Sequence, residues 1–209
     1  MKTMENATLL KNIAVSPPLA KIYQRLGFRK ATSQISSKTQ KETDRIIAQA
    51  ASLISLSGSF LRLSINDNSS GKILLAGDVT FQSKKLSVFL RNCKEAVLMG
   101  ATAGDEIMEA IKEKSAHGDL QAAVIYDATA SEMADAALDW IMEYINQLIR
   151  RERKTLLPRR FSAGYADFDL SNQKIIHQIL ALEKIGVQIT SECILLPEKS
   201  VTALTGICG

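Results

Sequence analysis

Arg160, Gly164 and Tyr165 lie within one six-residue segment and combine residue types that could bind a small charged ligand. An arginine guanidinium pairs with a carboxylate through two parallel hydrogen bonds. A glycine lets the main chain come close to a ligand because it has no side chain, and a tyrosine offers a flat ring and a hydroxyl. Together they would suit a zwitterion that carries an aromatic base. The alternative is a solvated arginine and a core tyrosine on a turn.

Other catalytic or metal-binding patterns are missing from the sequence. It contains no G-x-S-x-G motif, no Walker loop and no G-x-G-x-x-G motif. Its histidines are His117 and His177, and its cysteines, Cys93, Cys193 and Cys208, form no C-x-x-C pair. We therefore expect no structural metal and no disulfide framework.

The composition is that of an ordinary globular protein. The chain has 209 residues, of which 46% are hydrophobic and 23% are charged, and its net charge is +4. It has no apolar run long enough for a membrane span and no signal-peptide pattern, so we expect a cytoplasmic location. A basic run over residues 150–160 lacks interleaved aromatic residues. This run fits an acidic protein partner better than a nucleic acid.

Apolar residues recur at helical spacing in some segments and at every second position in others. The predicted helices are Lys38 to Ile54, Lys84 to Arg91, a stretch that stops at His117-Gly118, Thr129 to Arg153, and a helix capped by Ser171 and stopped by Gly186. The predicted strands are Phe60 to Asn66, Lys72 to Ala76, Glu95 to Ala103, and Val187 to Leu196, with Ser200 to Ile207 pairing back on the last. Strands in hairpins predict an α+β fold with an antiparallel sheet. We expect an irregular arm over residues 1–18 and a single domain over residues 19–209.

The helix predicted from Thr129 to Arg153 has the strongest pattern. Thr129 and Glu132 have the spacing of a capping box at its start. Its apolar stripe consists of Ala134, Ala137, Leu138, Ile141, Ile145 and Leu148. Asp135 and Asp139 lie one turn apart in an acidic row that continues to Glu143. Such a row is usually a solvated helix face, but it could also bind an ammonium group.

The pattern Arg160-x-x-x-Gly164-Tyr165 resembles the R-x-x-x-G-Y motif of the activation (reactivation) domain of vitamin B12-dependent methionine synthase. Residues 186–192 and 196–201 resemble that domain's last strand pair, and residues 134–139 resemble its acidic helix. The blocks occur in the same order and at similar separations, so the resemblance covers roughly residues 85–207. It departs from the family at Ala163, where the family often has proline.

The resemblance implies a twisted antiparallel sheet with packed helices and a function in cobalamin chemistry. The family binds S-adenosylmethionine and docks on the cobalamin domain of methionine synthase. With one electron from a flavodoxin-type donor, it supports reductive methylation of cob(II)alamin. Because this chain matches only that domain, we expect a free-standing activator that acts in trans. The alternatives are a non-catalytic docking protein for a corrinoid-dependent methyltransferase and, less favoured, a nucleic-acid-binding scaffold.

The resemblance also implies roles for five residues. Arg160 would pair with the methionyl carboxylate, and Asp135 would hold the ammonium group. Ser162 would contact the nucleotide through its main chain. Gly164 would permit close approach, and Tyr165 would line the wall that faces the corrinoid.

Overall fold

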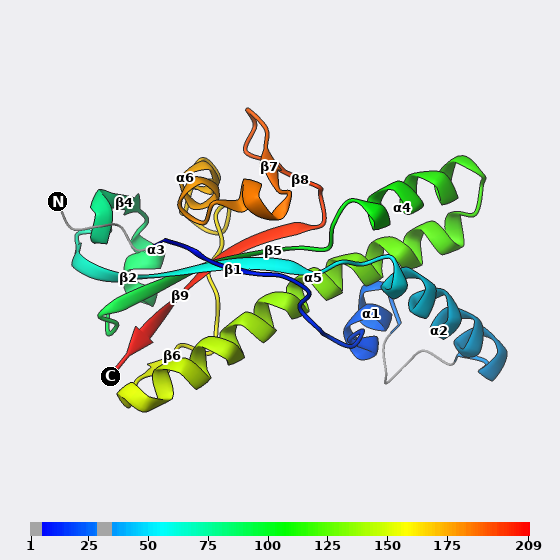
Figure 1. Cartoon of the computed structure of the whole chain (residues 1–209), viewed down its shortest axis with the longest axis horizontal. Helices are drawn as coiled ribbons and strands as arrows, with labels where there is room; N and C mark the ends of the chain where they lie inside the picture. The colour runs from blue at the N-terminus through cyan, green and yellow to red at the C-terminus, as the bar shows by residue number, and fades with distance from the viewer. Residues whose placement is uncertain (1–5, 29–34) are drawn as a thin grey trace.

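A twisted antiparallel sheet forms the centre of the computed structural model, which describes residues 6–28 and 35–209 (Figure 1). In spatial order its strands are β4 (Val79–Gln82), β3 (Lys72–Leu75), β2 (Ser57–Ser69), β5 (Glu95–Thr102), β9 (Ser200–Cys208) and β6 (Thr155–Leu156), with β1 (Thr8–Leu10) also paired to β2. A separate two-stranded sheet consists of β7 (Gln188–Ile189) and β8 (Leu195–Leu196). This architecture confirms the predicted α+β fold with an antiparallel sheet.

Helices build a hydrophobic core on each face of the sheet. One core packs α1 (Leu19–Arg25), α2 (Ser37–Ser52), α4 (Glu106–Ala116) and α5 (Leu120–Ile149) with one face. The other contains α3 (Lys84–Phe89) and α6 (Asn172–Ile179). Short 3-10 turns occur at η1 (Ala76–Asp78), η2 (Arg150–Glu152) and η3 (Leu182–Ile185). Within the two described ranges, no helix is both long and apolar enough to cross a bilayer.

The longest helix, α5, begins nine residues before the predicted start at Thr129. The Asp119 side chain caps it by accepting a hydrogen bond from the Ala122 N–H at 3.2 Å. Thr129 is fully buried inside the helix, and its hydroxyl donates to the Ile125 carbonyl at 2.7 Å. The predicted capping box is therefore wrong, because a buried threonine can satisfy its hydroxyl within the helix and needs no cap position.

The apolar stripe of α5 faces the sheet as predicted, except at its last position. Ile141 is fully buried, whereas Leu148 is 50% exposed, so its assignment to the stripe was wrong. The helix approaches the sheet closely at Gly58: a Cβ there would lie 2.7 Å from Ile141 Cδ1. The absence of a side chain at this position in β2 lets α5 lie against the sheet.

The C-terminal strands differ most from the prediction. The predicted pairing of residues 187–196 with 200–207 is wrong: β9 pairs with β5, from Glu95 opposite Ile207 to Thr102 opposite Ser200. Residues 187–196 contribute only the two-residue strands β7 and β8. Part of the predicted irregular arm, Thr8–Leu10, forms β1.

The helix predicted after Ser171 is present as α6, but its ends differ from the prediction. The Ser171 side chain makes no capping hydrogen bond. Instead, Asp169 Oδ1 accepts the Ser171 N–H at 2.8 Å. At the other end, Ala181 adopts a left-handed conformation directly after α6, and Gly186 ends η3 instead.

Packing at Ile141 should dominate the local stability of α5. Ile141→Ala removes a fully buried side chain, so we expect it to lower the free energy of unfolding by about 2–5 kcal/mol. Leu148→Ala, the control at a half-exposed position, should change it by no more than about 0.5 kcal/mol. Urea denaturation of the two variants measures the difference, and similar losses would contradict this packing arrangement.

Candidate functional site

The predicted R-x-x-x-G-Y segment follows the edge of the main sheet next to β9. The Phe161 N–H donates to the Leu204 carbonyl and the Leu204 N–H to the Phe161 carbonyl, both at 2.8 Å. Neighbouring side chains on extended backbone point to opposite faces. Phe161 is accordingly buried in the core that contains α6, while Arg160 reaches α5 on the other face.

Arg160 forms two ion pairs with the acidic row of α5. Its Nη2 lies 2.7 Å from Asp135 Oδ1, and its Nη1 lies 2.5 Å from Asp139 Oδ1. The Arg160 side chain is only 17% exposed, against 41% for Asp135 and 51% for Asp139. The Arg160 guanidinium is therefore largely buried, whereas the two carboxylates that pair with it remain partly exposed.

Residues 162–168 form a compact turn closed by main-chain hydrogen bonds. The Tyr165 N–H donates to the Ser162 carbonyl at 3.2 Å, and the Gly164 N–H donates to the Phe168 carbonyl at 2.7 Å. Gly164 has φ +83°, in the left-handed region that favours glycine. The motif glycine is thus required by the turn itself, whatever the turn binds.

Tyr165 extends from this turn and is 66% exposed. The ring meets Phe161 edge to face, with a centroid separation of 5.4 Å. The alternative that placed this tyrosine in the core is wrong, because most of the residue is open to solvent. An exposed aromatic ring could stack on a planar ligand.

Asp167 fastens the same turn to α3. Its carboxylate accepts hydrogen bonds from the Ser83 hydroxyl at 2.5 Å and from the Lys84 N–H at 2.8 Å. These bonds, with that of Ser83 first, hold the pKa of Asp167 below its ordinary value. Asp167 was not predicted, and no local pattern indicates it, because the helix start that it binds lies 83 residues earlier in the chain.

The five predicted site residues thus fall into two groups at one sheet edge. Arg160 and Asp135 form an ion pair beside α5. Ser162, Gly164 and Tyr165 share the turn, whose tyrosine ring packs against Phe161. A ligand that used all five would have to reach around this edge, with its charged end on the α5 face and its aromatic part near the turn, whose tyrosine packs on Phe161 of the other face.

Two further residues of this region, both on α1, were not predicted as partners. Lys21 on α1 lies 3.1 Å from Asp139, and Arg25 on α1 lies 2.6 Å from the buried Glu132. The sequence does contain a signal for this contact: Lys21 and Arg25 are spaced at i, i+4, so on a helix they form a basic face that complements the acidic residues of α5. It was overlooked because α1 itself was not predicted.

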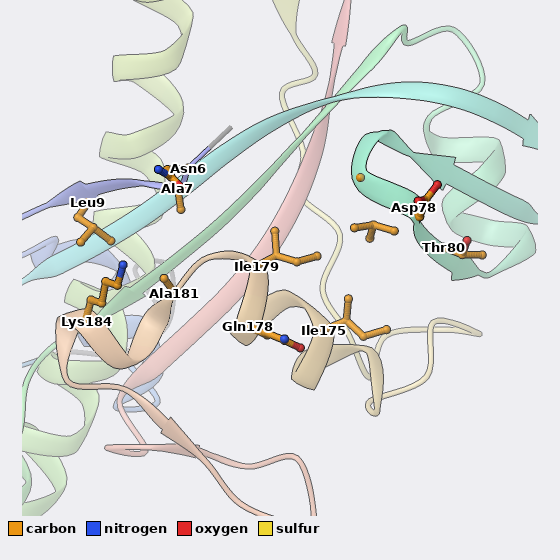
Figure 2. A pocket seen from close by; sticks show the side chains of 12 residues that line it. Asn6, Ala7, Leu9, Asp78, Thr80, Ile175, Gln178, Ile179, Ala181 and Lys184 are labelled. Carbon is orange, nitrogen blue, oxygen red and sulfur yellow. The ribbon is translucent and has the colours of Figure 1, made fainter. Parts of the chain in front are cut away.

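A separate cavity of about 450 Å³ lies on the α6 side of the sheet (Figure 2). Asp78 and Lys184 lie at its two ends, with Ile175 and Ile179 between them. None of the five predicted site residues lines it. This cavity is therefore distinct from the Arg160 site.

Comparisons with known proteins bear on the fold. No protein-family model and no curated protein matches the sequence. The structure is similar to a crystal structure of the MetH reactivation domain bound to AdoHcy, with a TM-score of 0.71. The match covers 98% of this chain and 79% of that chain at 13% sequence identity. At this identity the similarity establishes a shared fold, and it confirms the predicted resemblance at that level.

The anchoring of the turn by Asp167 should depend on pH. Because its folded-state pKa is depressed, its contribution to stability is present above the ordinary value of 3.8 and is lost as pH falls through the folded value. Asp167→Asn should therefore be less stable than wild type at neutral pH, and the two curves should converge in acid. Urea denaturation across pH 7 to about 2 tests this; parallel curves would contradict it.

Proposed function

We propose that this protein is an S-adenosylmethionine-binding activator that supports reductive methylation of cob(II)alamin on a partner methionine synthase in the cytoplasm. The observation that carries the proposal is the Arg160–Asp135 ion pair at the sheet edge from which the turn of the exposed Tyr165 continues, on the fold of the MetH reactivation domain. When bound, S-adenosylmethionine would supply the methyl group for the partner's corrinoid. The protein would act in trans as a component of the reactivation half-reaction.

The charges at the sheet edge fit the amino-acid end of S-adenosylmethionine. Its carboxylate would replace an aspartate on the Arg160 guanidinium, and its ammonium group would use the Asp135 carboxylate so released. Asp135 is 41% exposed, which leaves its carboxylate accessible from solvent. The main chain at Ser162 and Gly164 and the face of Tyr165 are candidates to hold the nucleoside. Positioning of this kind requires no acid or base from the protein.

An acidic electron donor of the flavodoxin type would find a basic surface after the end of α5. Arg150, Arg151, Arg153 and Arg159 are all exposed. Glu152, within the same run, is already paired with Arg62 at 2.6 Å and with Lys154 at 2.8 Å. The exposed arginines therefore keep an excess of positive charge, which would attract an acidic partner.

Calorimetric titration tests ligand binding directly. We expect wild type to bind S-adenosylmethionine, alone or with cobalamin-loaded methionine synthase. Arg160→Ala should weaken binding by about two- to tenfold, because the bound carboxylate loses its charged partner while the aspartates that Arg160 held in the free protein are released. Arg159→Ala removes the neighbouring, exposed arginine and should bind as wild type does. If wild type binds no S-adenosylmethionine either alone or with cobalamin-loaded methionine synthase, this function is excluded.

The alternative is a non-catalytic docking protein for a corrinoid-dependent methyltransferase. It is favoured by one observation: the Arg160 guanidinium already has two carboxylate partners. In that case Arg160 would only tie the sheet edge to α5. This alternative would be supported if the protein associates with the cobalamin-loaded partner but binds no S-adenosylmethionine, whether the partner is present or not.

The basic surface can be tested by charge reversal. Arg150→Glu/Arg151→Glu should slow flavodoxin-dependent reactivation by about tenfold at low ionic strength. At high salt the defect should shrink, because exposed charges are screened. Lys38→Glu/Lys41→Glu changes the net charge equally on α2, at the opposite end of the molecule (Figure 1). If both double variants behave alike, the arginine surface is not the docking site.

A further inference from the structure

Lys21 on α1 shares the two carboxylates that hold Arg160. Its Nζ lies 3.1 Å from Asp139 Oδ2 and 3.9 Å from Asp135 Oδ2. Arg160 uses the other oxygen, Oδ1, of each aspartate. The two aspartates therefore lie between two cations, and the outer oxygen of Asp135 already faces an ammonium group.

We propose that Lys21 acts as an internal competitor for the ammonium group of the ligand and thereby sets the affinity of the site. The proposal rests on the proposed function, because it concerns the same zwitterion. An ammonium group that approaches Asp135 has to displace Lys21 or accept its repulsion. Asp139, the carboxylate to which Lys21 already lies nearer, would keep the displaced lysine paired, so the exchange leaves no charge unpaired.

The fold holds Lys21 in this place through contacts other than its own ion pairs. Ile22, the next residue, is fully buried in the core beneath α1. Arg25, one turn later, is paired with the buried Glu132 at 2.6 Å. Asp139, the nearest carboxylate, raises the pKa of Lys21 above its ordinary value, so the lysine is charged at neutral pH. Loss of its side chain should leave α1 docked.

The competition should be measurable but modest. The Lys21 side chain is 49% exposed, and ion pairs between exposed groups are weak. Removal of Lys21 should therefore tighten ligand binding by about two- to fivefold rather than by orders of magnitude. The effect should decrease with added salt, as expected for charges that are open to solvent.

Calorimetric titration with S-adenosylmethionine and with S-adenosylhomocysteine tests the proposal on the full-length chain. Lys21→Met should bind more tightly than wild type, whereas Lys21→Arg keeps the cation and should bind like wild type. Arg25→Met removes the Arg25–Glu132 ion pair that helps to hold α1 but keeps Lys21 next to Asp135, so it controls for movement of the helix. It should not tighten binding.

The outcomes separate this proposal from the proposed function. If wild type binds and Lys21→Met binds equally or more weakly, Lys21 is not a competitor, and the proposed function stands. If Arg25→Met tightens binding as much as Lys21→Met, the effect comes from loosening α1, and the proposal fails. If neither wild type nor Lys21→Met binds either compound, with or without the cobalamin-loaded partner, the proposed function itself fails.

Discussion

The ion pairs of Arg160 with Asp135 and Asp139 fix the sheet edge to α5, and the arrangement of the candidate site depends on them. A guanidinium that is 17% exposed has lost much of its hydration, so it needs counter-charges nearby. Two carboxylates from successive turns of one helix provide them. This interaction determines where residues 160–165 leave the edge, and with that where the turn and Tyr165 lie.

The same ion pairs limit what a ligand can gain. A bound carboxylate would replace an aspartate that Arg160 already holds, so only the difference between two similar interactions contributes to affinity. Contacts to the aromatic base, or to a docked partner, would then have to supply most of the binding free energy. Recognition by such a site depends on the whole ligand rather than on its charged end.

Local sequence patterns predicted the location of helices and strands. They failed to predict which strands pair and which side chains meet, because those contacts join segments that are far apart in the chain. The apolar run of residues 95–103 predicted β5 almost to the residue. The pairing of β9 was wrong because its partner, β5, lies about 100 residues earlier in the chain. Likewise, Asp135 and Arg160 were both predicted as site residues, but no local pattern indicates that each is the other's partner.

The exposed ring of Tyr165 is the part of the site that packing alone does not explain. Most large aromatic side chains bury their surface, yet this one is 66% exposed on a turn closed by main-chain hydrogen bonds and anchored by Asp167. Such a turn fixes the main chain that carries the ring, so the backbone need not be ordered when a ligand binds, which lowers the entropy that binding would cost. An exposed aromatic ring on an anchored turn, at the same sheet edge as a cluster of balanced charges, suits a ligand that is both charged and aromatic.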